Sequence, residues 1–173
     1  MSKTLYISRG PSGSGKSFEI KKHVPPENIF STDDFWGPDY NFDASKLYEA
    51  HSWNKRRTEQ AMQQDITPIG VDNTNITWKE IKPYYKLAEQ YGYAIEYVES
   101  TSPWWKEMSS RFPLNTDELE HYAEILNTKN THGVPKETLK RMIQRWTPTD
   151  QLPKLRTESK MKTFKEYLKR IKA

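Results

Sequence analysis

One eight-residue stretch limits the folds open to this chain more than any other feature. Residues 10–17 read Gly-Pro-Ser-Gly-Ser-Gly-Lys-Ser and fit the pattern G-x-x-x-x-G-K-[ST]. The stretch follows residues 4–8, which predict a short buried strand, and residues 16–22 predict the start of a helix. A glycine loop in that setting turns its backbone N–H groups inward toward an anion, and the helix N-terminus adds about half a positive charge. The sequence therefore predicts a phosphate-binding loop.

The residues of this loop have distinct expected roles at bound ATP and Mg²⁺. Lys16 is expected to bridge the β- and γ-phosphates, and Ser17 is expected to ligate Mg²⁺. The other residues expected to contact the nucleotide are Gly10, Ser12, Gly13, Ser14 and Gly15. The alternative is a glycine-rich turn that carries Lys and Ser without binding phosphate.

Strands and helices alternate along the first hundred residues. Further strands are expected over residues 28–31, 68–72 and 93–98, with helices over residues 45–64 and 78–91. Four strands alternating with helices predict a parallel sheet covered on both faces. With 173 residues, 34% of them hydrophobic, the chain is long enough for one substantial core and short for two. The expected fold is an α/β P-loop NTPase of the kinase type, with a four-stranded parallel sheet, flanking helices and a helical lid.

The pattern changes beyond residue 100. Residues 103–105 and 111–115 look irregular, and helices are expected over residues 116–127 and 136–146. We interpret residues 101–146 as the lid of a kinase domain.

That domain is expected to span residues 1–146, and residues 147–173 to form a basic, helical C-terminal extension. Residues 154–173 carry eight Lys and Arg against two Glu, so they could contact a polyanion or simply be solvated. The apolar positions of this tail are expected to dock on the body of the protein; they are Met161, Phe164, Leu168 and Ile171.

The composition excludes several classes of protein. The chain has no Cys, which excludes a disulfide framework, a thiolate zinc site and a Cys nucleophile. No stretch approaches the roughly 18 apolar residues of a membrane span, and the first residues pass directly into a strand, which leaves no room for a signal peptide. We expect a soluble intracellular protein, cytoplasmic or nuclear, without a membrane partner.

Carboxylates follow two of the expected strands. Phosphoryl transfer needs a group that accepts the proton of the attacking hydroxyl, and Asp33 or Asp34 could do so. Alternatively, Thr32 or Asp33 only caps a turn. Asp72 could hold a Mg²⁺-bound water while the amides of Asn73 and Asn75 orient phosphate or substrate, although Asx turns use the same residues.

Other polar and aromatic residues are candidates for binding the acceptor. His51, Asn54 and Arg57 recur at three-residue intervals and could line an acceptor channel. Alternatively, His51 and Asn54 form structural hydrogen bonds. Charge that develops in the transition state calls for a cation from the lid, and the candidates are Arg111, Lys129, Arg141 and Arg145. Trp104 and Trp105 could stack a nucleobase or seal the lid.

These motifs together resemble the P-loop polynucleotide 5′-hydroxyl kinase family, in particular a small branch related to the kinase domain of NEDD-binding proteins. The resemblance covers most of residues 3–146. Its segments are residues 10–17, Ser-Thr-Asp-Asp-Phe-Trp at 31–36, Glu-Ala-His-Ser-Trp-Asn at 49–54, Val-Asp-Asn-Thr-Asn at 71–75, Lys-Pro-Tyr at 82–84, Tyr-Gly-Tyr at 91–93 and Asn-Thr-His-Gly-Val-Pro at 130–135.

The resemblance implies transfer of the ATP γ-phosphate to the 5′-hydroxyl end of RNA or DNA. Asp33 would be the general base, with Asp34 beside it. The family has a lid Arg just before the Asn-x-His-Gly motif, where this chain has Lys129, a point charge without the Arg fork. Trp36 stands three residues after the base, where the phage kinase has an Arg for the acceptor's 3′-phosphate. A kinase of a small metabolite or nucleoside, or a non-catalytic ATP-binding module, are the alternatives.

Overall fold

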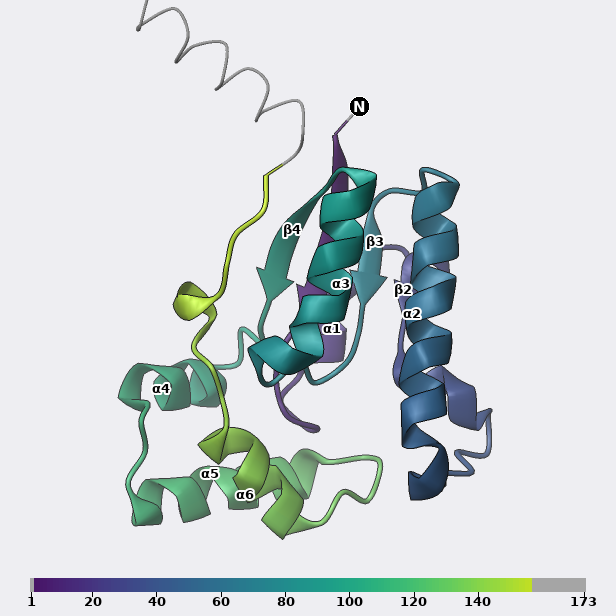
Figure 1. Ribbon diagram of the computed structural model, residues 1–173. Helices are drawn as coiled ribbons and strands as arrows, with labels where there is room; N and C mark the ends of the chain where they lie inside the picture. The colour runs from purple at the N-terminus through teal and green to yellow at the C-terminus, as the bar shows by residue number, and fades with distance from the viewer. Residues whose placement is uncertain (1, 157–173) are drawn as a thin grey trace, which may run out of the picture.

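The protein is built on a four-stranded parallel sheet in the order β2-β3-β1-β4 (Figure 1). This computed structural model describes residues 2–156. The strands are β1 (Lys3–Ser8), β2 (Ile29–Phe30), β3 (Ile69–Val71) and β4 (Tyr93–Val98). Because β3 inserts between β1 and β2, the loops after these three strands emerge together at one edge of the sheet. The predicted α/β fold with a four-stranded parallel sheet is confirmed.

Alternation along β1 divides its side chains between the two faces of the sheet. Leu5 and Ile7 are fully buried in the main apolar cluster, together with residues of α2 (Leu47–Gln63) and α3 (Trp78–Tyr91). Tyr6 faces the other way and stacks on His23, with their ring centroids 5.0 Å apart. His23 follows α1 (Lys16–Ile20), so the short helix of the phosphate loop lies on the face opposite α2 and α3.

Gly70 allows α1 to lie close to the sheet. A Cβ at this position would stand 3.0 Å from Cδ1 of Ile20, the last residue of α1. A side chain at position 70 would therefore require the side chains of Ile20 and Ile29 to move by a few tenths of an ångström.

Local capping signals explain where α3 begins and ends. Thr77 and Glu80 form a capping box at its start, and Gly92 ends it with a φ of 75°. The structure places this helix, and β4 after it, at the residues predicted from the sequence. Helix α2 is shorter than expected at its start, because residues 44–46 form a separate 3₁₀ turn capped by Asp43.

Three further helices gather at the end of the sheet where the strands terminate (Figure 1). They are α4 (Pro103–Arg111), α5 (Thr116–Lys129) and α6 (Lys136–Gln144). The expectation that residues 103–105 are irregular was wrong. Pro103 occupies the first turn of α4, where its missing N–H costs nothing and its fixed φ suits a helix.

These helices enclose an apolar cluster of their own. Trp105, Met108, Leu126 and Leu139 are at most 1% exposed and pack together, apart from the cluster under the sheet. The expectation of one core is therefore corrected to two. We call the region built on the sheet the body, and the region of α4, α5 and α6 the lid.

Residues 147–156 run back along the body after the lid. They form a 3₁₀ turn at Thr149–Gln151, and Leu152 enters the core of the body. The backbone N–H of Ile95 donates to the Leu155 carbonyl over 3.0 Å, and the Tyr97 hydroxyl donates to the Pro153 carbonyl over 2.7 Å.

The expected docking of Met161, Phe164, Leu168 and Ile171 lies outside the described residues. The division at residue 146 and the helical extension also stay predictions. Among the helices of the described chain, none is both long and apolar enough to cross a membrane.

Candidate active site

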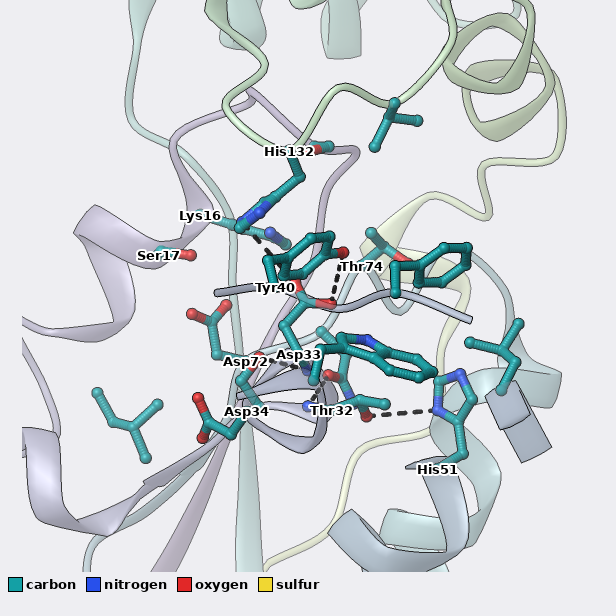
Figure 2. Close-up of a pocket in the computed structure, with 18 of the residues that line it drawn as sticks. Lys16, Ser17, Thr32, Asp33, Asp34, Tyr40, His51, Asp72, Thr74 and His132 are labelled. Atoms are coloured by element: carbon teal, nitrogen blue, oxygen red, sulfur yellow. Dashed lines mark hydrogen bonds and ion pairs between the residues drawn. The ribbon is translucent and has the colours of Figure 1, made fainter. Parts of the chain in front are cut away.

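The loops after β1, β2 and β3 line one cavity of about 550 Å³. Figure 2 shows Lys16, Ser17, Asp33 and Asp72 around this cavity, with His132 reaching toward it from the lid. Ligands of open α/β sheets bind in this position, beyond the carboxyl ends of strands that part to either side. We call it the active cavity.

The phosphate loop has the backbone geometry that its sequence predicts. Gly10, Gly13 and Gly15 all have positive φ values, of 147°, 89° and 95°. Residues with a Cβ rarely adopt such conformations, which turn consecutive N–H groups to one side. A Cβ at Gly13 would stand 2.8 Å from the Leu126 carbonyl oxygen, so the loop also packs against the end of α5.

One buried hydroxyl of this loop lacks a hydrogen-bond partner within the described chain. Ser14 is 1% exposed, and its Oγ has no hydrogen-bond partner among residues 2–156. Buried polar groups normally have a partner, so an orphan hydroxyl within an anion-binding loop is consistent with a ligand oxygen there. Lys16 and Ser12 line the active cavity, whereas Ser14 itself does not.

Ser17 and Asp72 line the same cavity and are the residues that could hold Mg²⁺. The Ser8 hydroxyl donates to Asp72 Oδ1 over 2.8 Å, which fixes the carboxylate. Within residues 2–156 no three His, Asp or Glu side chains gather into a metal site. A Mg²⁺ ion here would therefore depend on the nucleotide for much of its coordination, as is usual for this ion.

Asp33 presents its carboxylate to the active cavity. Ser31, and neither Thr32 nor Asp33, caps the 3₁₀ turn Thr32–Trp36: its Oγ accepts from the Asp33 backbone N–H over 3.3 Å. The Asp33 side chain is consequently available, and its Oδ1 accepts from the Tyr40 hydroxyl over 3.2 Å. Burial and the charge of Asp33 raise the pKa of Tyr40 to about 12, so the phenol stays protonated and can donate.

His132 brings the lid to this carboxylate. Its Nε2 lies 3.9 Å from Asp33 Oδ2, and its ring stacks on Tyr40 with centroids 4.7 Å apart. Asn130 shapes the loop: Oδ1 accepts from the His132 N–H over 3.1 Å, and Nδ2 donates to the Val134 carbonyl over 2.7 Å. The Ser12 hydroxyl also donates to Asn130 Oδ1 over 3.4 Å. One lid loop thus touches both the phosphate loop and Asp33.

Comparison with known proteins finds a matching family and a relative of similar sequence. A family model described as an AAA domain matches residues 5–111, which include the phosphate loop, Asp33 and Asp72. The chain belongs to this family. It is also 34% identical over 160 residues to human NEDD4-binding protein 2, a match that covers 90% of this chain. The chain spans 8% of the length of that human protein.

Membership of the AAA domain family gives the cavity a general role. The protein is a P-loop, kinase-like domain of a nucleotide-binding family, and its phosphate loop at residues 10–17 lies within the matched region. The match ends at residue 111, so all of α5 and α6 lie beyond it.

Asn54 was expected to line an acceptor channel, and the structure corrects this. Its side chain is fully buried, and Nδ2 donates to the Tyr84 hydroxyl over 3.0 Å and to the Phe30 carbonyl over 3.3 Å. Its Oδ1 accepts from Nε of Arg57 over 2.8 Å. Asn54 therefore joins α2, α3 and β2, and no part of it remains for a substrate.

Arg57 likewise faces the body of this AAA domain and does not line the active cavity. Its guanidinium donates to the Ser31 carbonyl over 2.9 Å and to Asp34 Oδ2 over 2.5 Å, and it lies 4.1 Å from the Trp53 ring centroid. It therefore positions the loop that carries Asp33, and the expected contact with substrate is corrected to this role. Asp34 lines the cavity with its carboxylate already paired.

Four other predicted residues lie at or beside the cavity. His51 lines it, with Nδ1 3.4 Å from the Thr32 hydroxyl, and partial burial lowers its pKa. Asn73 lines it and accepts from the Thr32 N–H over 2.9 Å. Trp36 lines it although only 6% of the residue is exposed. Asn75 is 2% exposed and donates to the Ser8 carbonyl, so it connects the loops after β3 and β1.

The expected lid cations do not reach the active cavity in this structure. Lys129 is exposed at the end of α5, and Arg145 lines a second cavity on the other side of His51. Their catalytic roles stay predictions. Trp105 is 1% exposed, and its Nε1 donates to Glu99 Oε1 over 2.8 Å. It therefore seals the lid, which was the alternative to stacking on a nucleobase.

Sequence reasoning missed Tyr40 and His132. The only signal for His132 was its place in the segment at residues 130–135, to which no role was given. Tyr40 had no signal, because its contact with Asp33 depends on the turn at residues 37–40.

Proposed function

We propose that the protein is an ATP-dependent polynucleotide 5′-hydroxyl kinase, acting on RNA or DNA ends. The observation that carries this proposal is the position of Asp33. Its carboxylate lies in the same cavity as Lys16 and already accepts a hydrogen bond from a hydroxyl, that of Tyr40. An incoming hydroxyl in place of the phenol would meet the group that a phosphotransferase needs as a base.

The chemistry follows from these positions. Asp33 accepts the proton of the acceptor 5′-hydroxyl, whose oxygen forms a bond to the γ-phosphorus of ATP. The bond from that phosphorus to the β,γ-bridging oxygen breaks, and ADP leaves. Lys16 neutralises negative charge on the transferred group, as do the N–H groups of the phosphate loop. A Mg²⁺ ion held through Ser17 and Asp72 would supply further charge stabilisation.

The side of the active cavity away from the phosphate loop supports a nucleotide acceptor. Phe42 and Leu47 line it from the body, and Val134 and Met142 line it from the lid. Phe42 is 53% exposed and Leu47 is 42% exposed, so these apolar surfaces are available for contact. A flat apolar base fits such a wall better than a strongly hydrated sugar or metabolite does.

The test measures transfer of γ-³²P from ATP to 5′-hydroxyl RNA and DNA oligonucleotides with Mg²⁺. We expect label on the oligonucleotide, and a loss of at least a hundredfold in both Asp33→Asn and Lys16→Ala. Asp39→Asn is the matched control, because Asp39 is an exposed carboxylate near the site that does not line the cavity.

Other outcomes separate the alternatives. Label on a nucleoside, sugar or other metabolite, with none on oligonucleotides, would indicate a small-molecule kinase. Binding of ATP without turnover of any acceptor would indicate a non-catalytic module. Full transfer by Asp33→Asn would remove Asp33 from the role of base.

A further inference from the structure

A second cavity, of about 730 Å³, adjoins the active cavity. The two share the side chains at their junction, which are Leu47, His51, Asn73, Thr74 and Met142. The second cavity continues between α2, the start of α3 and the end of α6. We call it the outer groove. An acceptor whose end lies at Asp33 can therefore extend into this groove.

Three cations from three separate elements line the outer groove. Lys55 belongs to α2, Lys79 to the first turn of α3, and Arg145 follows α6. None of them is in an ion pair with another of residues 2–156. Glu80 also lines the groove, but its carboxylate accepts from the backbone N–H groups of Ile76 and Thr77. The groove thus has an excess of unpaired positive charge, which favours an anionic occupant.

An aromatic side chain stands at the rim of the same groove. Tyr48 lines it and is 86% exposed, the highest value among the large apolar residues of the described chain. Tyr48, Ser52 and Lys55 recur at the spacing of one helix face, so the ring and the ammonium group lie along one side of the groove. An exposed aromatic ring next to unpaired cations is the combination that binds single-stranded nucleic acid.

We propose that the outer groove holds the nucleotides that follow the 5′-terminal nucleotide of a single-stranded polynucleotide. A base stacks on Tyr48, and Lys55, Lys79 and Arg145 neutralise the phosphates that come after it. A duplex end fits less well, because its bases are already stacked on each other and cannot receive the Tyr48 ring. This inference rests on the proposed function and specifies its substrate as an oligonucleotide longer than one nucleotide.

The first experiment compares acceptors of different length. The full chain is assayed on a nucleoside 3′-monophosphate, a single-stranded hexanucleotide and a blunt duplex of the same sequence. We expect the hexanucleotide to be preferred. Tyr48→Ala is expected to lower kcat/KM for the hexanucleotide about tenfold, since it removes one stacked base, and to leave the mononucleotide unchanged. Tyr48→Phe keeps the ring and is expected to retain the preference.

The second experiment measures binding without catalysis. A hexanucleotide with a 3′-fluorescein label is titrated with protein at several salt concentrations, and log Kd is plotted against log salt. Each lost phosphate contact is expected to lower the slope by about 0.7, so Lys55→Ala and Arg145→Ala should each reduce it. Lys106→Ala on α4 is the matched control, because Lys106 is exposed and lines neither cavity.

The two experiments distinguish failure of this inference from failure of the proposed function. If no acceptor is labelled but Tyr48→Ala and Lys55→Ala weaken hexanucleotide binding, the groove binds nucleic acid and the kinase proposal fails. If the variants lose activity equally on the mononucleotide and the hexanucleotide, the groove proposal is wrong. It is also wrong if they keep an undiminished preference for the longer acceptor and an unchanged salt slope. Preference for the duplex over the single strand would also overturn it.

Discussion

The body and the lid differ in how they deliver functional groups to the same cavity. In the body, the phosphate loop, Asp33 and Asp72 each follow a strand, so the sheet brings them to one edge, and Arg57 of α2 further holds the loop that carries Asp33. The lid contributes His132 from a loop between two helices, and this loop reaches Asp33 only because the lid docks on the body. The phosphate loop and both carboxylates are therefore placed by the body, whereas the approach of His132 to Asp33 depends on the contact between the two regions.

Arg9 is one of the residues that connect the two regions. It follows β1, is fully buried, and donates to the Asn75 carbonyl over 2.9 Å and to the Ile76 carbonyl over 2.8 Å. Its guanidinium lies 4.1 Å from the ring centroid of Trp146, a residue of the lid core. Burial lowers the pKa of Arg9 to about 10, and the charge of Glu99 opposes that shift, so the group remains protonated at neutral pH.

The largest expected effect on the connection between body and lid comes from the removal of the Arg9 side chain. Arg9→Ala leaves the Asn75 carbonyl without its hydrogen-bond partner, removes one of the two donors to the Ile76 carbonyl, which keeps the Thr147 N–H, and opens a space beside Trp146. We therefore expect the free energy of unfolding to fall by about 3–5 kcal/mol. Urea denaturation followed by circular dichroism measures this. Arg111→Ala, at an exposed lid Arg paired with Glu107 over 3.1 Å, is the control and should cost less than about 1 kcal/mol. A similar small cost at Arg9 would show that the regions are joined by other contacts.

Matched substitutions in the two cores test whether the regions unfold together. Ile69 in the body is fully buried and Ile143 in the lid is 1% exposed, so replacement of either by Ala is expected to cost about 2–5 kcal/mol. Because Arg9 and Trp146 connect the cores, we expect one denaturation transition for each variant. Hydrogen exchange at the amides of β1 provides the check. Unchanged protection of β1 in Ile143→Ala would mean that the lid opens independently of the body.

The contribution of the lid to catalysis is tested at His132. His132→Ala removes the stack on Tyr40 and the nitrogen near Asp33, and we expect kcat/KM for the labelled oligonucleotide to fall about tenfold, with ATP affinity unchanged. His121→Ala, at an exposed His of α5, is the control. If the two variants behave alike, closure of this loop does not assist transfer.

The smallest expected effect concerns pH. The pKa of Tyr40 is raised to about 12, above the ordinary value of 10.0, so its protonated form is favoured in the folded protein. The resulting stabilisation is complete below pH 10 and is lost as pH rises toward 12. Thermal unfolding midpoints of the native protein and Tyr40→Phe should therefore differ by a constant amount up to pH 10 and converge above it. A difference that disappears by pH 8 would contradict the hydrogen bond to Asp33.

Local signals explain the parts of the fold that were predicted well. The capping box of Thr77 and Glu80, and Gly92 after α3, act within a few residues of the helix ends, so their effect can be read directly from the sequence. The start of the lid was predicted less well, because Pro has two opposite effects on helices. Residues 103–105 were therefore interpreted as irregular. Proline breaks a helix in its interior but starts one at its first turn, and only the position of the helix decides between the two.

Within the candidate site, the sequence alone determined the phosphate loop, the placement of Asp33 and Asp72 after strands, and hence a nucleotide site at the sheet edge. Those features depend on spacing along the chain and on one rule of parallel sheets. Tertiary structure alone decided that Asn54 and Arg57 support the body, and that Tyr40 and His132 meet at Asp33. The reason is physical: a polar side chain on a helix serves structure or substrate according to whether other elements cover it, and that depends on packing between residues far apart in the sequence.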